Sequence, residues 1–369
     1  MLRLQTTRYG TDTPKMPPLE LTLEVVPHAR IDVTDVRARA AVEHGNVLDR
    51  FAHCLYYSFH TTAGYLPQSL AARLAAHNPQ GVRPYVDLFR TLFPEGAGYR
   101  HDDLDQRVEL TAEQRPTEPA NGDSHLAFIA SGLDACVSYV NRRQGPVCFI
   151  DLDGTYEGTP RRRKTTLIGY NREIEIATMR IEVPVSAHPI DAINLKDPQL
   201  GVYDQLSAFI AAHDIPKGRL QVQLAPGEQR ANLTVNEYES LLMRHDLADV
   251  LRNPLRFATE KARNMMNDPA SVPFKTIEYA RYDLVRALNR LVDVIGLGES
   301  RIERLMARAM AVPVSRFLRM RRSVSLLVSE TPTTGPGIVA GTYQSPILVQ
   351  WARAPKGVRV LDVRLTKFE

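Results

Sequence analysis

Three histidines of this chain lie in polar segments where side chains can converge on a ligand. His60 lies in a turn after an apolar strand, and His101 and His125 lie in polar stretches farther along the chain. Neutral imidazoles are the commonest protein ligands for zinc and other divalent first-row metals, and three of them leave coordination positions open for water or substrate. Most single histidines are surface or hydrogen-bonded core residues, so a shared site needs further support.

A basic run, Arg161-Arg162-Arg163-Lys164, offers a second kind of chemistry. Arginine makes bidentate contacts with anions, so the run is a candidate phosphate clamp. Because only alternate side chains of a strand share a face, the clamp would use Arg161 with Arg163, or Arg162 with Lys164. The alternative is the solvated face of an edge strand, where charge discourages aggregation.

An apolar strand at 147–152 leads into Asp151-Leu152-Asp153-Gly154-Thr155. This string resembles the first motif of haloacid-dehalogenase-type phosphatases, in which the first aspartate is the nucleophile, the second is the acid–base group, and magnesium binds the phosphate. The context does not match, because an Arg-rich β segment follows instead of a βαβ unit and no convincing acidic pair lies after residue 160. A phosphatase using Asp151 and Asp153 is therefore a minor alternative.

The elements that must position these residues mix strands and helices, which predicts an α+β fold. Alternating or apolar runs predict strands near 19–26, 54–59, 126–130, 136–140, 147–152, 163–169, 173–183 and 220–224. Caps and helical periodicity predict helices near 35–44, 67–76, 83–92 and 205–213.

One pattern occurs twice along the chain. Residues 136–140, Gly145-Pro146 and Gly154-Thr155-Tyr156 resemble 323–328, Gly335-Pro336 and Gly341-Thr342-Tyr343. Such repetition indicates two related β-rich domains in tandem, of which only the first carries the histidines. The predicted units are a lead-in at 1–18, a first domain at 19–177 and a degenerate second domain at 178–369. Arg-rich helical periodicity at about 245–322 is interpreted as an all-helical insertion into the second domain.

Four motifs of the first half resemble the YjbQ family, small trimeric α/β proteins described as secondary thiamine-phosphate synthases. In chain order they are His60-Thr61-Thr62-Ala63-Gly64, Gly98-Tyr99-Arg100-His101, Asn121-Gly122-Asp123-Ser124-His125, and Gly154-Thr155-Tyr156-Glu157-Gly158 before the arginines. The resemblance covers about residues 19–180 and implies two YjbQ-like β-sandwich domains with helices. The second half resembles the family more faintly, through Asn232-Leu233-Thr234-Val235-Asn236-Glu237.

The resemblance implies that His60, His101 and His125 share one divalent metal ion, either zinc, another first-row metal or magnesium. It also implies two sets of supporting residues: Asn121 and Asp123 as catalytic or ligand-orienting groups, and Thr61, Thr62, Arg161, Arg162 and Arg163 as substrate or phosphate contacts. Each half lacks motifs that the other retains. We therefore expect Asn236 or Glu237 of another domain to complete the site, with Glu237 as a catalytic candidate.

Composition narrows the class of protein. The formal net charge of +4 permits anionic ligands without requiring nucleic acid, and three cysteines give no disulfide framework. No stretch approaches the roughly 20 apolar residues of a membrane helix. We expect a cytoplasmic protein with no membrane partner and no nucleic-acid partner, and the family implies a homo-oligomer.

The expected function is that of a metal-dependent enzyme acting on a phosphorylated or otherwise anionic small molecule. It would be a transferase, hydrolase or lyase of the YjbQ type, and the family description suggests the joining of a pyrimidine pyrophosphate to a thiazole phosphate. Fold membership is weak evidence for a particular reaction. The alternative is a non-catalytic binding or scaffold protein whose site has decayed.

Overall fold

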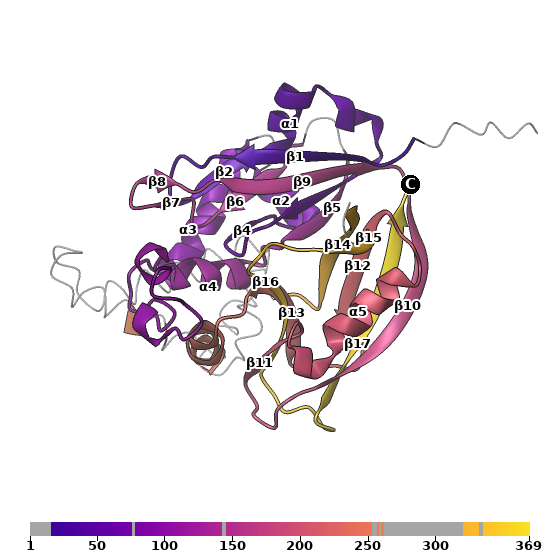
Figure 1. Ribbon diagram of the computed structural model, residues 1–369. Helices are drawn as coiled ribbons and strands as arrows, with labels where there is room; N and C mark the ends of the chain where they lie inside the picture. Colours follow the sequence, from indigo (N-terminus) through magenta and orange to yellow (C-terminus); the bar gives the residue numbers. More distant parts are fainter. Residues whose placement is uncertain are drawn as a thin grey trace, which may run out of the picture.

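The computed structural model describes residues 16–75, 78–141, 145–252, 257, 260–261, 320–331 and 335–369. Most of the predicted lead-in and of the predicted insertion lies outside these residues. The described part has several antiparallel sheets with helices packed on them (Figure 1). None of its helices is long and apolar enough to cross a membrane.

The first half contains two sheets and a short ribbon. The larger sheet has the order β1 (Leu19–Val25), β9 (Arg163–Tyr170), β3 (His53–Ser58) and β5 (Cys136–Val140). The smaller sheet has the order β2 (Asp32–Asp35), β6 (Cys148–Asp151) and β4 (Ala63–Gly64), and β7 (Thr155–Tyr156) pairs with β8 (Thr159–Pro160). The helices are α1 (Val36–His44), α2 (Gln68–Ala75), α3 (Arg83–Leu92) and α4 (Gly122–Ser131).

The second half contains its own two sheets. The larger has the order β10 (Glu173–Pro184), β17 (Val358–Phe368), β12 (Lys217–Leu224), β14 (Ser323–Thr331) and β15 (Gly335–Val339). The smaller has the order β11 (Asp191–Asn194), β16 (Gln344–Gln350) and β13 (Ala231–Glu237), and the helices are α5 (Val202–Ala211), the π-helix η6 (Leu242–Asp246) and α6 (Leu247–Arg252). Strand β10 begins at Glu173, earlier than the predicted boundary after residue 177, because its first residues already pair with the end of β17.

Short 3-10 segments complete the described elements: η1 (Val47–Arg50), η2 (Pro79–Val82), η3 (Leu104–Gln106), η4 (Arg115–Thr117) and η5 (Pro198–Leu200). Helix α1 begins where predicted, because the Asp35 side chain accepts the backbone N–H groups of Arg37 and Ala38 as an N-cap.

The two halves use one strand order, since β1-β9-β3-β5 corresponds to β10-β17-β12-β14 and β2-β6-β4 to β11-β16-β13. Val25 pairs with Arg163 as Val183 pairs with Arg359, so the two arginines occupy equivalent positions. Asp32 likewise pairs with Asp151 as Asp191 pairs with Gln350.

The Gly-Thr-Tyr triplets are not equivalent, contrary to the sequence-based alignment. Gly154-Thr155-Tyr156 follows β6, whereas Gly341-Thr342-Tyr343 precedes β16, which is the counterpart of β6. Equivalent residues of the two halves are therefore identified from the strand register and not from the three-residue sequence match.

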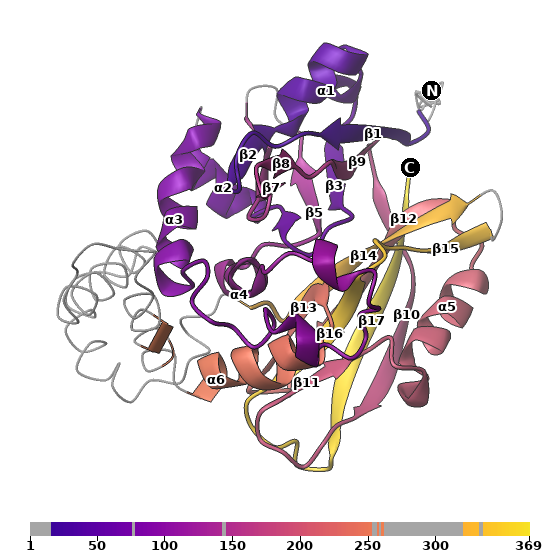
Figure 2. The same cartoon turned by 60° about the vertical axis from the view of Figure 1, so that its left-hand side comes forward.

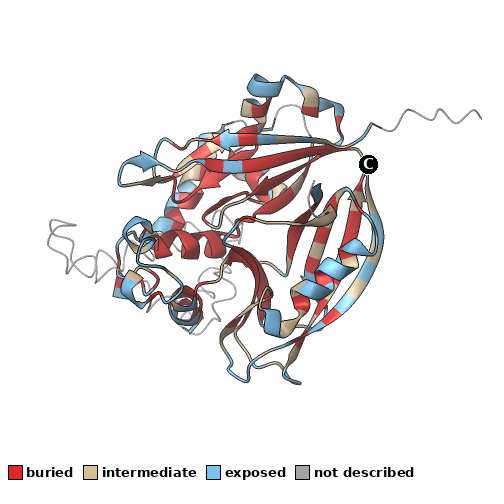
Figure 3. Ribbon diagram, in the orientation of Figure 1, coloured by how far each residue is buried: buried red, intermediate tan, exposed pale blue. Residues whose placement is uncertain are grey.

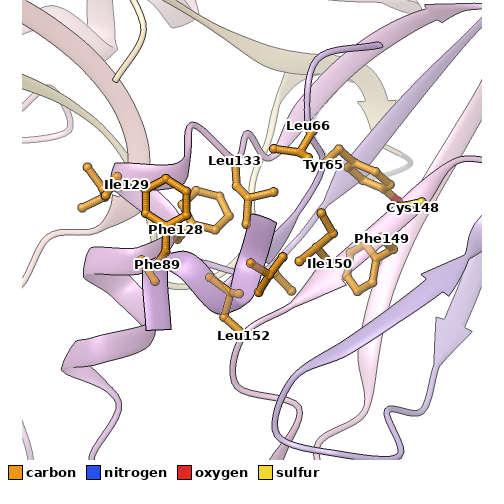
Figure 4. Packing of buried hydrophobic residues seen from close by; sticks show 14 of the residues in the cluster. Tyr65, Leu66, Phe89, Phe128, Ile129, Leu133, Cys148, Phe149, Ile150 and Leu152 are labelled. Atoms are coloured by element: carbon orange, nitrogen blue, oxygen red, sulfur yellow. The ribbon is translucent and has the colours of Figure 1, made fainter. Parts of the chain in front are cut away.

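The predicted strand near 126–130 is wrong, because these residues belong to α4. All ten residues of α4 are buried, so the helix has no polar face to give it a helical period. A short apolar run of this kind cannot be assigned to a strand or a buried helix by periodicity alone. Phe128 and Ile129 pack with Phe89, Ile150 and Leu152 (Figure 4).

Both halves contribute to shared cores. The largest hydrophobic cluster includes α4 together with Leu242, Ile347 and Val349 of the second half. Leu55 and Ile168 of the first large sheet pack with Leu327 of the second. Helix α4 lies beside β13 (Figure 2), and both are buried almost throughout (Figure 3). The helix that carries His125 is therefore buried at the junction of the two halves.

Candidate active site

Two of the three predicted histidines meet at this junction. His101 follows α3 in a loop, and His125 lies in the first turns of α4 rather than at a strand end or in a loop. Both are buried, and their rings make an edge contact with centroids 5.0 Å apart. Backbone N–H groups of Arg100 and His101 donate to the Asp246 carboxylate at 3.1 and 2.9 Å, which fixes the loop against η6.

His101 has an acceptor at each ring nitrogen. Its Nδ1 lies 3.2 Å from Glu239 Oε2, and its Nε2 lies 3.1 Å from Asn121 Oδ1. The Asn121 amide cannot be reversed without loss, because its Nδ2 donates to the Asp153 carboxylate at 2.7 Å. Both ring nitrogens therefore face acceptors, an arrangement that favours the imidazolium form of His101.

The pKa values at this pair agree with that assignment. Burial alone would lower the pKa of His101, but the hydrogen bond to Glu239 and the nearby carboxylates outweigh it and raise the pKa. Burial would raise the pKa of Glu239, but His101 and the N–H groups of Leu241 and Leu242 lower it. Each partner therefore holds the other in its charged form.

His125 has the opposite protonation. Its Nδ1 lies 2.8 Å from Asn236 Oδ1, and Asn236 is oriented by donating its Nδ2 to the Thr61 carbonyl at 2.9 Å. Nδ1 is therefore the protonated nitrogen, and Nε2 presents a lone pair 3.6 Å from Glu237 Oε2. Burial and then the charge on His101 lower the pKa of His125 well below its usual value, so its ring is neutral.

Glu237 is the most accessible member of this group, although only 15% of its side chain is exposed. Burial raises its pKa in spite of the nearby His101 and Arg107 charges. Arg107 donates from Nη2 to Glu237 Oε1 at 3.0 Å, and it also pairs with Glu109 and Glu118. The arginine fixes one oxygen of Glu237 and leaves the other facing His125.

Asp123 does not belong to this group of contacts. Its carboxylate accepts from Arg30 Nη2 at 2.8 Å and from the Ser124 hydroxyl at 3.4 Å. Burial raises the pKa of Asp123 to about 6, although Arg30 opposes the shift. Asp123 therefore joins α4 to the loop after β1, and Asn121 is the member of the Asn-x-Asp motif that contacts a histidine.

The arginine run divides by alternation as predicted, but the three arginines do not form one clamp. Arg163 is buried and donates to both oxygens of Asp151 at 2.7 and 3.0 Å. Arg161 donates to Asp153, whereas Arg162 is 76% exposed and pairs with Glu24. Of the three, only Arg161 is both partly exposed and joined to the histidine network.

These contacts account for the two aspartates of the phosphatase-like string. Asp151 neutralises Arg163, and Asp153 Oδ2 accepts from both Arg161 and Asn121. The β7–β8 ribbon follows them rather than a crossover helix. Among the described residues Asp153 Oδ1 is buried without a hydrogen-bond partner. The geometry gives the phosphatase alternative no support.

The turn at 60–62 holds the network mainly through its backbone. The Thr61 carbonyl accepts from Asn236, and the Thr62 carbonyl accepts from Leu152 N at 3.0 Å. His60 Nε2 accepts the backbone N–H of Lys164 at 2.8 Å. Burial, assisted by the charges of Arg163 and Arg161, lowers the pKa of His60 to about 3.

The described donors do not fit the expected metal ion. In this part of the chain, no group of three or more His, Cys, Asp or Glu side chains is placed to hold one. Both nitrogens of His101 face other partners, and Nε2 of His60 is used by the backbone. We therefore derive no chemical step through a metal.

Sequence analysis missed Glu239, Arg107 and Asp246. Glu239 stands two residues after Glu237, so the same Asn-Glu segment could have identified it. Arg107 lies in a segment without a pattern and Asp246 at the start of the predicted helical insertion, and only the fold brings them to the histidines.

Comparisons with known proteins identify similar solved structures but assign no function. No family model matches the chain, and no curated protein matches it. A YbjQ-like protein of unknown function from Sulfolobus solfataricus P2 is 16% identical, with a TM-score of 0.29, covering 53% of this chain and 99% of that one. A hypothetical protein from Aeropyrum pernix K1 is 16% identical, with a TM-score of 0.26, covering 53% and 100%. An uncharacterised YjbQ-family protein from Clostridium acetobutylicum is 12% identical, with a TM-score of 0.25, covering 51% and 98%.

Proposed function

We propose that this protein is an enzyme that transfers a proton within a phosphorylated or otherwise anionic small molecule at His101, His125 and Glu237. The observation that supports it is the pair of contacting, buried histidines whose partners hold one ring charged and the other neutral. Titratable groups whose environments drive their protonation states apart are typical of acid–base sites.

In this proposal Glu237 exchanges the proton with the substrate, because it is accessible and His125 is not. When Glu237 carries the proton, it can donate a hydrogen bond to Nε2 of His125, which stays unprotonated because burial and the charge on His101 lower its pKa. The fixed charge on His101 favours the ionised form of Glu237, so it stabilises the carboxylate after the proton leaves. Arg107 orients the carboxylate throughout.

We also propose that the halves arose by duplication of one YjbQ-like domain. The shared strand order and the equivalent Arg163 and Arg359 support this, as does the sequence resemblance. The proposed site uses His101 and His125 from the first half and Asn236, Glu237 and Glu239 from the second. One chain therefore supplies both parts of a site that neither half contains alone.

The first test compares two glutamates that share Arg107. Glu237→Gln removes the acid–base group and should lower turnover roughly 100- to 10,000-fold, the usual contribution of such a group. Glu109→Gln should retain nearly full turnover, because Glu109 contacts Arg107 but is 44% exposed and has no histidine contact. Turnover is followed in D2O by mass spectrometry, as deuterium incorporated into a mixture of phosphorylated metabolites that includes the pyrimidine pyrophosphate and thiazole phosphate pair, because proton transfer within a molecule does not otherwise change its mass.

Equal activity of the two variants would remove Glu237 as the acid–base group, whereas no conversion by the wild-type protein would favour the non-catalytic alternative. Metal removal tests the remaining expectation from the family. Because no group of three or more described His, Cys, Asp or Glu side chains is placed to hold a metal ion, we expect chelator-treated protein to retain its turnover and to contain no stoichiometric metal by element analysis. If the wild-type protein contains stoichiometric metal and His125→Ala loses it, the hypothesis of a metal-dependent enzyme would be supported instead.

A further inference from the structure

Lys261 is a buried lysine beside the loop that carries His101, and the proposed proton transfer does not use it. Only 7% of the residue is exposed. Its Nζ donates to the Gly98 carbonyl oxygen at 2.5 Å and lies 3.9 Å from Asp246 Oδ1. Gly98 begins the short segment that ends at His101, so the lysine contacts this loop directly.

Two aromatic rings face the ammonium group of Lys261. Its Nζ lies 4.3 Å from the ring centroid of Tyr99 and 5.0 Å from that of Phe257. The two ring centroids are 6.2 Å apart. A lysine ammonium over aromatic faces gains cation–π attraction, and the gain is larger when the group is desolvated. The ammonium group is therefore held by contacts with the loop on several sides.

Asp246 connects Lys261 to the backbone of His101. Its Oδ1, which faces the lysine, accepts from Arg100 N at 3.1 Å, and its Oδ2 accepts from His101 N at 2.9 Å. Burial raises the pKa of Asp246, whereas the two N–H groups and the charge of Lys261 oppose the shift. The lysine therefore favours the ionised carboxylate, which is the stronger acceptor for both N–H groups.

Asp102 extends the influence of Lys261 to the start of α4. Its Oδ1 accepts from the backbone N–H of Gly122 at 2.9 Å, and Gly122 is the first residue of α4. Burial raises the pKa of Asp102, and Lys261 is among the charges that oppose the shift. Asn121, which contacts His101, directly precedes Gly122. One cation thus offsets two buried carboxylates that hold the backbone on either side of the His101 ring.

We propose that Lys261 is a positioning residue for His101, acting through the Gly98 carbonyl and the Asp246 carboxylate. Its catalytic consequence rests on the proposed function, whereas its hold on the loop does not depend on turnover. Lys261 lies in the segment interpreted as an insertion at about 245–322. Part of that segment would therefore set the geometry of a site whose two histidines belong to the first half.

Amide hydrogen exchange of Arg100 and His101, measured by NMR, tests the hold on the loop. Lys261→Met removes the charge and the donor but keeps most of the apolar stem. Because the N–H groups then face a carboxylate without its counter-charge, their exchange should accelerate at least about tenfold. Lys261→Arg retains a cation and a donor, so its exchange should stay within about threefold of wild type.

Lys196→Met is the matched control for the loss of a partly buried lysine. Lys196 Nζ also donates to a backbone carbonyl, that of Gln344 at 2.6 Å, and it lies 5.4 Å from the ring centroid of Tyr203. Exchange at Arg100 and His101 in this variant should stay within about twofold of wild type. Equal acceleration by Lys261→Met and Lys196→Met, or none by either, would overturn the positioning role.

Turnover, followed as deuterium incorporation, measures the catalytic consequence. Lys261→Met should lower kcat roughly 10- to 100-fold and leave KM within about threefold, because small misplacements of a group that acts on the reaction can cost about 100-fold in rate. Lys261→Arg should recover most of the loss, and Lys196→Met should keep the wild-type kcat. A purely structural role would lower the amount of folded protein and leave kcat per folded molecule unchanged, which would overturn the positioning role.

The two readouts separate failure of the positioning role from failure of the proposed function. Faster exchange in Lys261→Met, with no turnover by the wild-type protein, would support the hold of Lys261 on His101 and remove the acid–base proposal. Wild-type turnover that Lys261→Met leaves unchanged would remove the positioning role alone. If Lys261→Met fails to fold, Lys261→Gln decides by the same measurements, because it keeps a donor for Gly98 and loses only the charge that faces Asp246.

Discussion

At the scale of single residues, the amide of Asn121 decides the protonation of the site. Because Asn121 donates from Nδ2 to Asp153, Oδ1 of Asn121 must face His101. Glu239 provides a second acceptor, at the other ring nitrogen of His101. A buried imidazolium costs desolvation energy, which these two acceptors and the neighbouring carboxylates offset.

Glu239→Gln should therefore convert His101 to a neutral ring at pH 7. Glu239 Oε1 accepts from Leu241, and Oε2 accepts from Leu242 and lies at His101 Nδ1, so a glutamine keeps an oxygen on only one of these two sides. In either orientation it removes the carboxylate charge that raises the pKa of His101. Imidazole 15N shifts measure the change directly. The wild-type protein should show His101 protonated on both nitrogens at pH 7, and a neutral His101 there would refute the assignment.

At the scale of elements, the sequence predicted strands β1, β3, β5, β6, β9, β10 and β12 and helices α1, α2, α3 and α5, but not α4. Strands such as β9 and β12 could be predicted because their residues are alternating or β-branched. Helix α1 could be predicted from its N-cap residue, Asp35. Helix α4 is buried on every side, so only its tertiary surroundings define it.

The candidate site divides in the same way between what local sequence can and cannot predict. His101, His125, Asn121 and Glu237 were predicted because each lies in a short motif. The separation of His60 from the histidine pair was not, because it depends on a backbone hydrogen bond from Lys164, on a distant strand. Arg107 and Asp246 likewise act across the junction, where spacing along the chain is uninformative.

The helix η6 offers a prediction at this scale. Asp246→Ala removes the acceptor of two N–H groups in the His101 loop, and leaving them unsatisfied should cost roughly 2 to 4 kcal/mol of unfolding free energy. Asp249→Ala in the adjoining α6 is the control, because Asp249 is 56% exposed and forms its ion pair, among the described residues, with the exposed Arg252. Urea denaturation should separate the two variants, and similar losses would argue against a role for Asp246 in holding the loop.

At the scale of the whole molecule, neutral buried histidines make stability fall in acid. His60 has a folded pKa of about 3 against an unfolded value near 6.5, so the unfolded chain binds a proton that the folded chain refuses. Stability should therefore decline as pH falls from about 6.5 toward 3. His125, whose pKa is lowered further by burial, adds to the same trend.

His60→Gln isolates the His60 share of this trend. Since every other titrating group is common to both proteins, the variant should match the wild type at pH 7 and gain up to about 2 kcal/mol on it at pH 5. Urea denaturation at the two pH values gives the difference. A constant difference across this range would show that His60 is protonated in the folded protein.

The buried arginine that recurs in the two halves limits the order in which substitutions can accumulate. Arg163 is neutralised by Asp151 and Arg359 by Glu228, and the counterpart of each acid in the other half is uncharged. Glu228 is the counterpart of His60, because each accepts the backbone N–H of the residue after the arginine. If one half changes from one acid position to the other by single substitutions, its intermediate has either both acids or neither. The state with neither strands a buried cation, at a cost of roughly 3 to 5 kcal/mol. A lineage that starts with glutamate at position 60 and an uncharged residue at position 151 can thus gain histidine at position 60, without stranding the arginine, only after position 151 has become acidic.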